Sequence, residues 1–194
     1  MPTTDHIPDF QIQSGGIYSE ACLARNISSF SGLCSFVWAL PYRRNPDKDN
    51  LLTVFTDNCG TCSTKHALLK LVADEHFANG IQLILCLFRM NARNTPKVAQ
   101  ILKNKDIDYI PEAHMYLKYN GYIHDFTGAG FTPSNYENDI LEELEIGPGQ
   151  ANRFKVEYHK KYLHNWLILK DSPQISFARL WEARENCIAA LAGN

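Results

Sequence analysis

Cys62 combines a reactive residue type with a position that would activate it. It follows Gly60-Thr61 and precedes an apolar stretch of helical period that runs to about Asn79-Gly80. A thiol at the N-terminus of a helix meets the positive end of the helix dipole, which favours the thiolate. Backbone N–H groups at the same helix end stabilise an oxyanion on an attacked carbonyl. Cys62 is therefore the candidate nucleophile.

A β-hairpin is expected further along the chain. Met115–Tyr119 and Tyr122–Phe126 flank Asn120-Gly121, and this dipeptide is the strongest short-range signal for a two-residue turn because both residues accept positive φ. Such a turn pairs Tyr119 with Tyr122 and Lys118 with Ile123. The register of the whole hairpin follows from this turn.

The predicted register brings a histidine and a carboxylate together. Tyr116 opposes Asp125 and His114 opposes Thr127, so these four side chains project to the same face. His114 and Asp125 are then diagonal neighbours, close enough for one hydrogen bond that fixes the imidazole tautomer. His124 faces the other way and is interpreted as a core histidine. Tyr116 and Thr127 are candidates for lining a substrate cleft.

Cys62, His114 and Asp125 together suggest a catalytic triad. In this hypothesis the Cys62 thiolate attacks an amide carbonyl, and His114 protonates the leaving amine while Asp125 orients its ring. Water or a second amine then resolves the thioester. The hypothesis needs no metal and no organic cofactor, and the partner is a protein, peptide or other amide substrate.

Four segments resemble the transglutaminase-like superfamily, whose members have a papain-like fold and the catalytic order Cys, His, Asp. These are the nucleophile segment 60–69, the His and Asp strands at 114–117 and 122–127, and the helix end 36–42 that precedes the cysteine. The resemblance covers residues from about 27 to about 130. That superfamily includes protein cross-linking enzymes, proteases, deamidases and glycopeptide amidases.

The resemblance implies an α+β fold in which the nucleophile helix packs on an antiparallel sheet. We expect one domain over residues 1–194, with a core at about 27–130, extra helices at both ends and a C-terminal helical extension at about 150–194. The superfamily often has an aromatic or amide oxyanion helper upstream of the cysteine. In this chain the resemblance implies Trp38 or Tyr42 for that role.

Periodicity and punctuation predict the remaining elements. Thr95-Pro96 is expected to start a helix, with Thr95 as its N-cap. Asp139–Glu145 is interpreted as a solvated acidic surface. The other predictions are a helix at about 26–40, a short strand or helix turn at 51–55, a strand at 81–88, and helices at 156–169 and 175–191.

A redox alternative uses Cys59-Gly60-Thr61-Cys62, a C-x-x-C sequence before a helix. This sequence resembles a thioredoxin-type site, and Ile110-Pro111 followed by a hairpin extends the likeness. Against it, Asn58 stands where the usual tryptophan precedes the first cysteine. The redox interpretation also leaves the alignment of His114 with Asp125 unused.

Two further alternatives stay open. Cys59, Cys62, His66 and His76 contain the start of a zinc-site pattern but lack a second C-x-x-C or H-x-x-x-H pair. A scaffold of this type also serves as a non-catalytic binding module, and the acidic Asp139–Glu145 face would then meet a basic partner.

Composition limits the classes of function. Nineteen Lys and Arg against 21 Asp and Glu give a formal charge of −2, which argues against a nucleic-acid partner. No apolar run has the length of a membrane span, and Met1–Gln13 does not resemble a signal peptide, so we expect a cytoplasmic protein without a membrane partner. The sequence leaves the oligomeric state open. Six scattered cysteines do not form a disulfide framework, and three are expected to be buried hydrophobes without a role: Cys34, Cys86 and Cys187.

Overall fold

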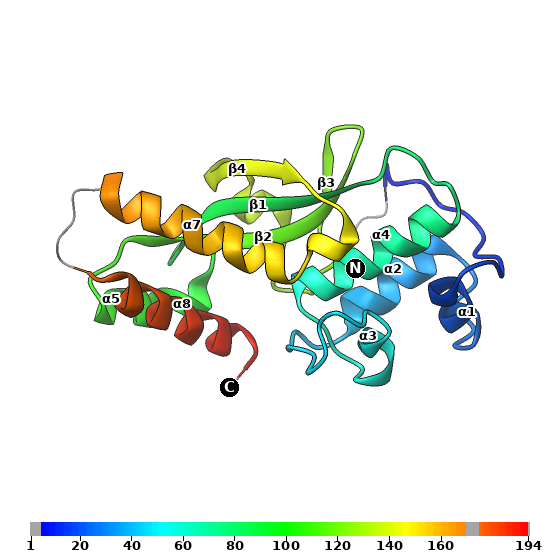
Figure 1. Cartoon of the computed structure of the whole chain (residues 1–194), viewed down its shortest axis with the longest axis horizontal. Helices are drawn as coiled ribbons and strands as arrows, with labels where there is room; N and C mark the ends of the chain where they lie inside the picture. Colours follow the sequence, from blue (N-terminus) through cyan, green and yellow to red (C-terminus); the bar gives the residue numbers. More distant parts are fainter. Residues whose placement is uncertain (1–4, 170–174, 194) are drawn as a thin grey trace. The chain divides into compact units, whose positions relative to one another are not determined.

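The computed structural model describes residues 5–169 and 175–193 and has an α+β architecture (Figure 1). Within this part of the chain, four strands form one antiparallel sheet in the order β3-β2-β1-β4. The α+β class expected from the sequence is therefore confirmed. The strands are β1 (Gln82–Asn91), β2 (Tyr109–Tyr119), β3 (Tyr122–His124) and β4 (Ile140–Glu145). The α-helices are α1 (Ile17–Leu23), α2 (Phe30–Ala39), α3 (Thr53–Thr56), α4 (Cys62–Glu75), α5 (Ala99–Asn104), α6 (Pro133–Tyr136), α7 (Arg153–Leu169) and α8 (Phe177–Leu191).

The chain divides into two compact units. The first comprises the described parts of Met1–Leu85, Met115–Pro133 and Leu144–Asn152. The second comprises those of Cys86–His114, Ser134–Glu143 and Arg153–Asn194. Three strands, β1, β2 and β4, pass from one unit into the other. The expected single domain stays a prediction.

Helix α4 is the centre of the first unit, and α1, α2 and α3 pack around it (Figure 1). Its buried residues include Leu68, Leu69 and Val72, which recur at helical spacing as the sequence predicted. Each such side chain contributes roughly 1.5–3 kcal/mol on burial. The buried face of α2 comprises Phe30, Leu33, Cys34 and Val37.

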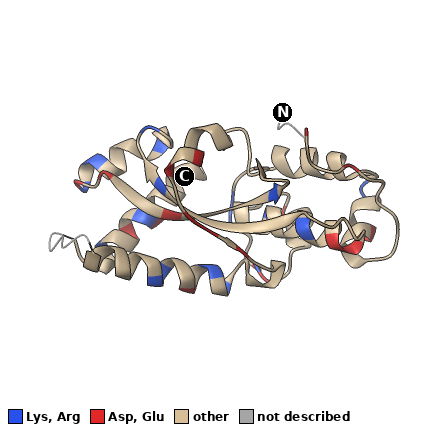
Figure 2. Ribbon diagram, turned by 90° about the horizontal axis from the view of Figure 1, so that it is seen from above, with Lys and Arg blue, Asp and Glu red and all other residues tan. Residues whose placement is uncertain are grey.

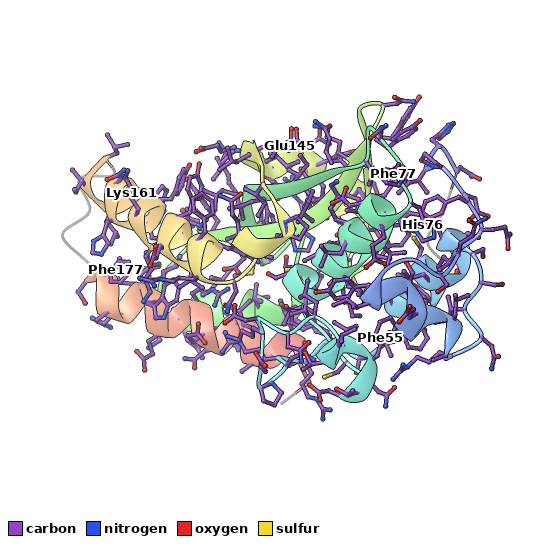
Figure 3. The ribbon with its side chains drawn as sticks, turned by 45° about the vertical axis from the view of Figure 1, so that its right-hand side comes forward. Phe55, His76, Phe77, Glu145, Lys161 and Phe177 are labelled. Atoms are coloured by element: carbon purple, nitrogen blue, oxygen red, sulfur yellow. The ribbon has the colours of Figure 1, made fainter. Side chains whose placement is uncertain are left out.

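The end of α4 comes earlier than the sequence suggested. The helix ends at Glu75 rather than near Asn79-Gly80, and Figure 3 shows His76 and Phe77 at this end. Phe77 takes a positive φ of 53°, which a helix cannot continue through. The His76 ring bonds to the Val72 carbonyl through Nδ1 at 2.9 Å and accepts the Gln13 N–H at Nε2.

The predicted hairpin register is confirmed where β2 and β3 pair. Lys118 faces Ile123, and the turn residues Asn120 and Gly121 have φ of 48° and 84°. The second strand is shorter than predicted because it ends at His124. Beyond the strand, the Phe126 and Thr127 N–H groups donate to side chains instead of to a neighbouring strand.

The second unit contains an ion pair between β2 and α8 in which Glu112 is buried and Arg184 is largely covered. Arg184 donates to both carboxylate oxygens of Glu112, from Nε at 2.9 Å and from Nη2 at 2.5 Å. His159, on α7, donates from Nε2 to the Pro111 carbonyl at 2.7 Å. Within the unit, α8 packs against α5 and α7 (Figure 1).

Two segments agree only in part with the sequence expectations. Most of the acidic Asp139–Glu145 stretch is the edge strand β4, and Glu145 accepts a hydrogen bond from Gln82 on β1. Charged side chains are typical of an edge strand because they oppose pairing with other chains. Thr95 is the N-cap residue of a 3-10 turn that continues into α5, as the sequence predicted, but its side chain makes no capping hydrogen bond. Its hydroxyl donates to Asn94 Oδ1, and a 3-10 turn at Pro96–Val98 precedes α5.

The other element predictions agree with the structure to within a few residues. The segment at 51–55 ends in the short helix α3, and the C-terminal helices correspond to α7 and α8. None of the described helices is long and apolar enough to cross a membrane. Figure 2 shows basic and acidic residues interspersed along the described helices.

Candidate active site

Cys62 is the first residue of α4, as the sequence predicted. Thr61 precedes the helix as its N-cap residue, and the Thr61 N–H donates to Thr64 Oγ1 at 3.0 Å. The first N–H groups of a helix have no acceptor within the helix, and they carry the positive end of its dipole. Cys62 is 4% exposed. The thiol therefore lies just below the surface at the helix end that favours its ionised form.

The segment before Cys62 is held against the end of α2. The Gly60 N–H donates to the Pro41 carbonyl at 3.2 Å, and the Arg43 N–H donates to the Gly60 carbonyl at 3.1 Å. These bonds form an isolated parallel bridge between Tyr42 and Gly60. Tyr42, one of the two oxyanion candidates, is thus paired with a residue two positions before the nucleophile.

Trp38, the other oxyanion candidate, lies on α2. Its carbonyl oxygen is 3.7 Å from the position that a Cβ on Gly128 would occupy, so its backbone borders the segment that follows Asp125. The Tyr42 ring packs against Phe131 with a centroid distance of 5.4 Å. Trp38 borders the segment that follows Asp125, and Tyr42 pairs with the segment that carries Cys62. The assignment of either as oxyanion helper stays a prediction.

Asp125 lies one residue beyond the end of β3 and is 5% exposed. Its Oδ1 accepts the Thr127 N–H at 2.9 Å, a local side-chain bond that turns the backbone out of the strand. The Phe126 N–H donates to His66 Nε2 at 2.8 Å. The carboxylate is therefore fixed by its own segment and by helix α4.

His66 connects Cys62 to the segment that carries Asp125. Because its Nε2 accepts the Phe126 N–H, the proton of the neutral ring is on Nδ1, which donates to the Cys62 carbonyl at 2.8 Å. Asp125 Oδ1 is 3.6 Å from the same Nε2, and in this tautomer the contact is not an ion pair. The sequence pattern suggested only a zinc ligand at His66 and did not indicate this role.

The sequence patterns did not indicate a role for Lys65 either. Its side chain is fully buried, and its Nζ donates to the Leu40 carbonyl and to the Thr127 carbonyl, each at 2.7 Å. Leu40 is the C-cap residue of α2, and Thr127 follows Asp125 by two residues. The Thr127 hydroxyl is buried and makes no hydrogen bond within the described residues.

His114 and Tyr116 lie on β2, and the unit boundary falls between them. His114 closes the Cys86–His114 stretch of the second unit, where the edges of its ring face Phe88 and Tyr136 at centroid distances of 6.0 and 5.3 Å. Tyr116 belongs to the first unit and is fully buried, which favours packing over substrate contact. Cys62 and Asp125 both lie in the first unit. The complete triad with His114 stays a prediction.

Asn45 organises the loop in front of the nucleophile helix. This buried amide donates to the Cys59 carbonyl at 3.2 Å and to Asp57 Oδ2 at 3.0 Å, and it accepts a hydrogen bond from the Thr64 hydroxyl at 3.0 Å. The Cys59 sulfur accepts from Arg43 Nε at 3.4 Å. The sequence pattern gave no signal for Asn45, which lies in an irregular Pro-containing loop.

The structure weakens the zinc alternative. Both ring nitrogens of His66 and of His76 are engaged by backbone groups. Across residues 5–169 and 175–193, no three His, Cys, Asp or Glu side chains are grouped so that they could hold a metal ion.

The structure also weakens the redox alternative. A thioredoxin-type site requires a strand immediately before the C-x-x-C sequence, whereas the short helix α3 and the bridge at Gly60 occupy this stretch. The sheet is antiparallel throughout. Cys59 therefore lies in a different structural context from the first cysteine of such a site.

Comparison with known proteins leaves the site to be interpreted from its own geometry. No family model, curated protein or solved structure matches the chain.

Proposed function

We propose that this protein is a cysteine-nucleophile enzyme that hydrolyses or transfers the acyl group of an amide, on a papain-like core of the transglutaminase-like type. The observation that carries the proposal is the placement of Cys62 at the first position of α4, joined through His66 to the segment that holds Asp125. The peptidases, deamidases and cross-linking enzymes of that superfamily define the class of substrate, a protein or peptide amide.

In the proposed reaction, the Cys62 thiolate adds to the amide carbonyl, and the oxyanion is stabilised by N–H groups at the start of α4 with Trp38 or Tyr42. His114 gives its proton to the leaving amine, and the C–N bond breaks to leave a thioester on Cys62. Water or a second amine then attacks the thioester, and His114 accepts its proton. Asp125 orients the imidazole and stabilises its charged form.

The alkylation rates of the individual cysteines test this proposal. The full-length protein is treated with limiting iodoacetamide near neutral pH, and the modified thiols are mapped by mass spectrometry. Burial raises the pKa of Cys22 and of Cys187 to about 12, so these two remain unreactive thiols. Cys62 is expected to react first.

Variants assign the activation of Cys62. His114→Ala should slow its alkylation on the order of tenfold. Loss of the neighbouring imidazolium should raise the pKa of the Cys62 thiol by about one unit, which reduces the thiolate fraction tenfold. Asp125→Asn should slow it less. His124→Gln is the matched control, since His124 is a buried histidine next to Asp125, and it should leave the rate unchanged. Unchanged alkylation in His114→Ala, or faster alkylation of Cys59 than of Cys62, would contradict the proposal.

A further inference from the structure

Lys65 is a buried cation whose hydrogen-bond partners are both neutral. Its Nζ donates to the Leu40 and Thr127 carbonyls, and its side chain has no exposed surface. A buried charge is costly unless a countercharge compensates it, and carbonyl dipoles compensate only part of the cost. Such a residue is expected to have a role other than stabilising the fold.

The position of Lys65 in α4 is also unfavourable for a cation. It is the fourth residue of the helix, where a cation opposes the positive end of the dipole. The neighbouring chain is also shaped around its stem. A Cβ on Gly60 would lie 2.9 Å from Lys65 Cγ, closer than real Cβ atoms approach other atoms, so a side chain at position 60 would displace the lysine.

Three titratable groups act on the Lys65 ammonium. Burial lowers the pKa of Lys65 to about 8, and the charges of Asp125, Cys62 and Cys59, in that order, oppose this shift. The group therefore remains a cation at neutral pH. Coupling is reciprocal: if the negative charge on Cys62 favours the ammonium, the ammonium favours the negative charge on Cys62 by the same free energy.

We propose that Lys65 is a positioning residue of the Cys62 site, which keeps Cys62 as a thiolate and Asp125 as a carboxylate. Its two hydrogen bonds also join the end of α2 to the backbone that follows Asp125. The three segments that carry Trp38, Cys62 and Asp125 therefore meet at one side chain. This inference rests on the proposed function and adds to it the internal cation that supports the nucleophile.

The ionisation of Cys62 tests the inference directly. The ultraviolet absorbance of thiolate is recorded against pH for the full-length protein, and the curve of the Cys62→Ser variant is subtracted to isolate Cys62. The same subtraction is made in the Lys65→Met background, where the curve of the double variant Lys65→Met, Cys62→Ser is subtracted from that of Lys65→Met. The titration midpoint of Cys62 should be higher by about one pH unit, which is a tenfold loss of thiolate at neutral pH. Lys70→Met, on the same helix and paired with Asp74, is the control and should leave the midpoint unchanged.

A second measurement does not depend on the folding of a lysine variant. Cys62→Ser is nearly isosteric, and NMR titration of the Lys65 ammonium in this variant should give a lower pKa than in the wild type. An unchanged midpoint in folded Lys65→Met, or an unchanged Lys65 titration in Cys62→Ser, would overturn the inference. Neither measurement involves His114 or a substrate, so this failure is distinguishable from failure of the proposed function.

Discussion

Each of the two units contains a cation with little or no exposed surface, and the two cations are held in opposite ways. In the second unit, Arg184 binds both oxygens of Glu112. In the first, Lys65 binds two carbonyl oxygens. Burial disfavours the charged form of both side chains. For Arg184 the charge of Glu112 outweighs the effect of burial and raises the pKa. For Lys65 the effect of burial prevails, and the pKa falls to about 8.

The difference separates a structural charge from a functional one. A bidentate ion pair neutralises its field within the pair and fixes two elements to each other. A cation held by neutral dipoles keeps its field available to ionisable neighbours, which here are Asp125, Cys62 and Cys59. The comparison predicts that removing Arg184 mainly affects stability, and that removing Lys65 mainly affects ionisation.

The largest expected effect is on the stability of the second unit. Arg184→Met leaves the Glu112 carboxylate buried without its main partner, and this should cost about 3–5 kcal/mol of unfolding free energy, measured by denaturant titration. Glu112→Gln combined with Arg184→Met removes both charges and should cost less. Equal losses in the single and double variants would show that the pair is not the source of the stability.

The next effect concerns Lys65 and alkaline pH. In the unfolded chain the lysine keeps its proton up to about pH 10.5, whereas in the folded protein it releases the proton near pH 8. Raising the pH through this window therefore favours the folded state. The stability of the wild type relative to Lys65→Met should rise by on the order of 3 kcal/mol between these two values. A flat or falling difference would contradict the assignment of Lys65 as a cation whose ionisation is dominated by its burial.

The smallest effect distinguishes two histidines of α4. His66→Leu removes the acceptor of the Phe126 N–H and the side-chain donor to the Cys62 carbonyl, and this should cost about 1–3 kcal/mol. His76→Leu is the matched control, because His76 makes the same two kinds of bond at the other end of the helix but is only partly buried. Denaturant titration of both variants should show the larger loss for His66→Leu, and the reverse order would contradict the proposed link.

Short-range sequence patterns predicted the hairpin and the start of α4. The Asn120-Gly121 turn fixed the hairpin register, and the cysteine before an apolar helical stretch located the start of α4. Strand β4 was missed because its alternation is weak and acidic, which is typical of an exposed edge. The roles of Lys65 and His66 were missed because their partners are distant in sequence: Lys65 reaches 62 residues to Thr127, and His66 reaches 60 residues to Phe126. A lysine in the first turns of a helix was the available signal, since it opposes the dipole.

In the proposed reaction Cys62 carries the acyl group, and rapid acylation by an activated ester tests this step. The protein is mixed with p-nitrophenyl acetate and quenched early, and the intact mass and the peptide map are recorded. The account predicts one acetyl group per molecule on Cys62, bound as a thioester that hydroxylamine removes, formed more slowly in His114→Ala and absent in Cys62→Ser. Acetylation at other residues alone, or an unchanged initial release of nitrophenolate from Cys62→Ser, would contradict it.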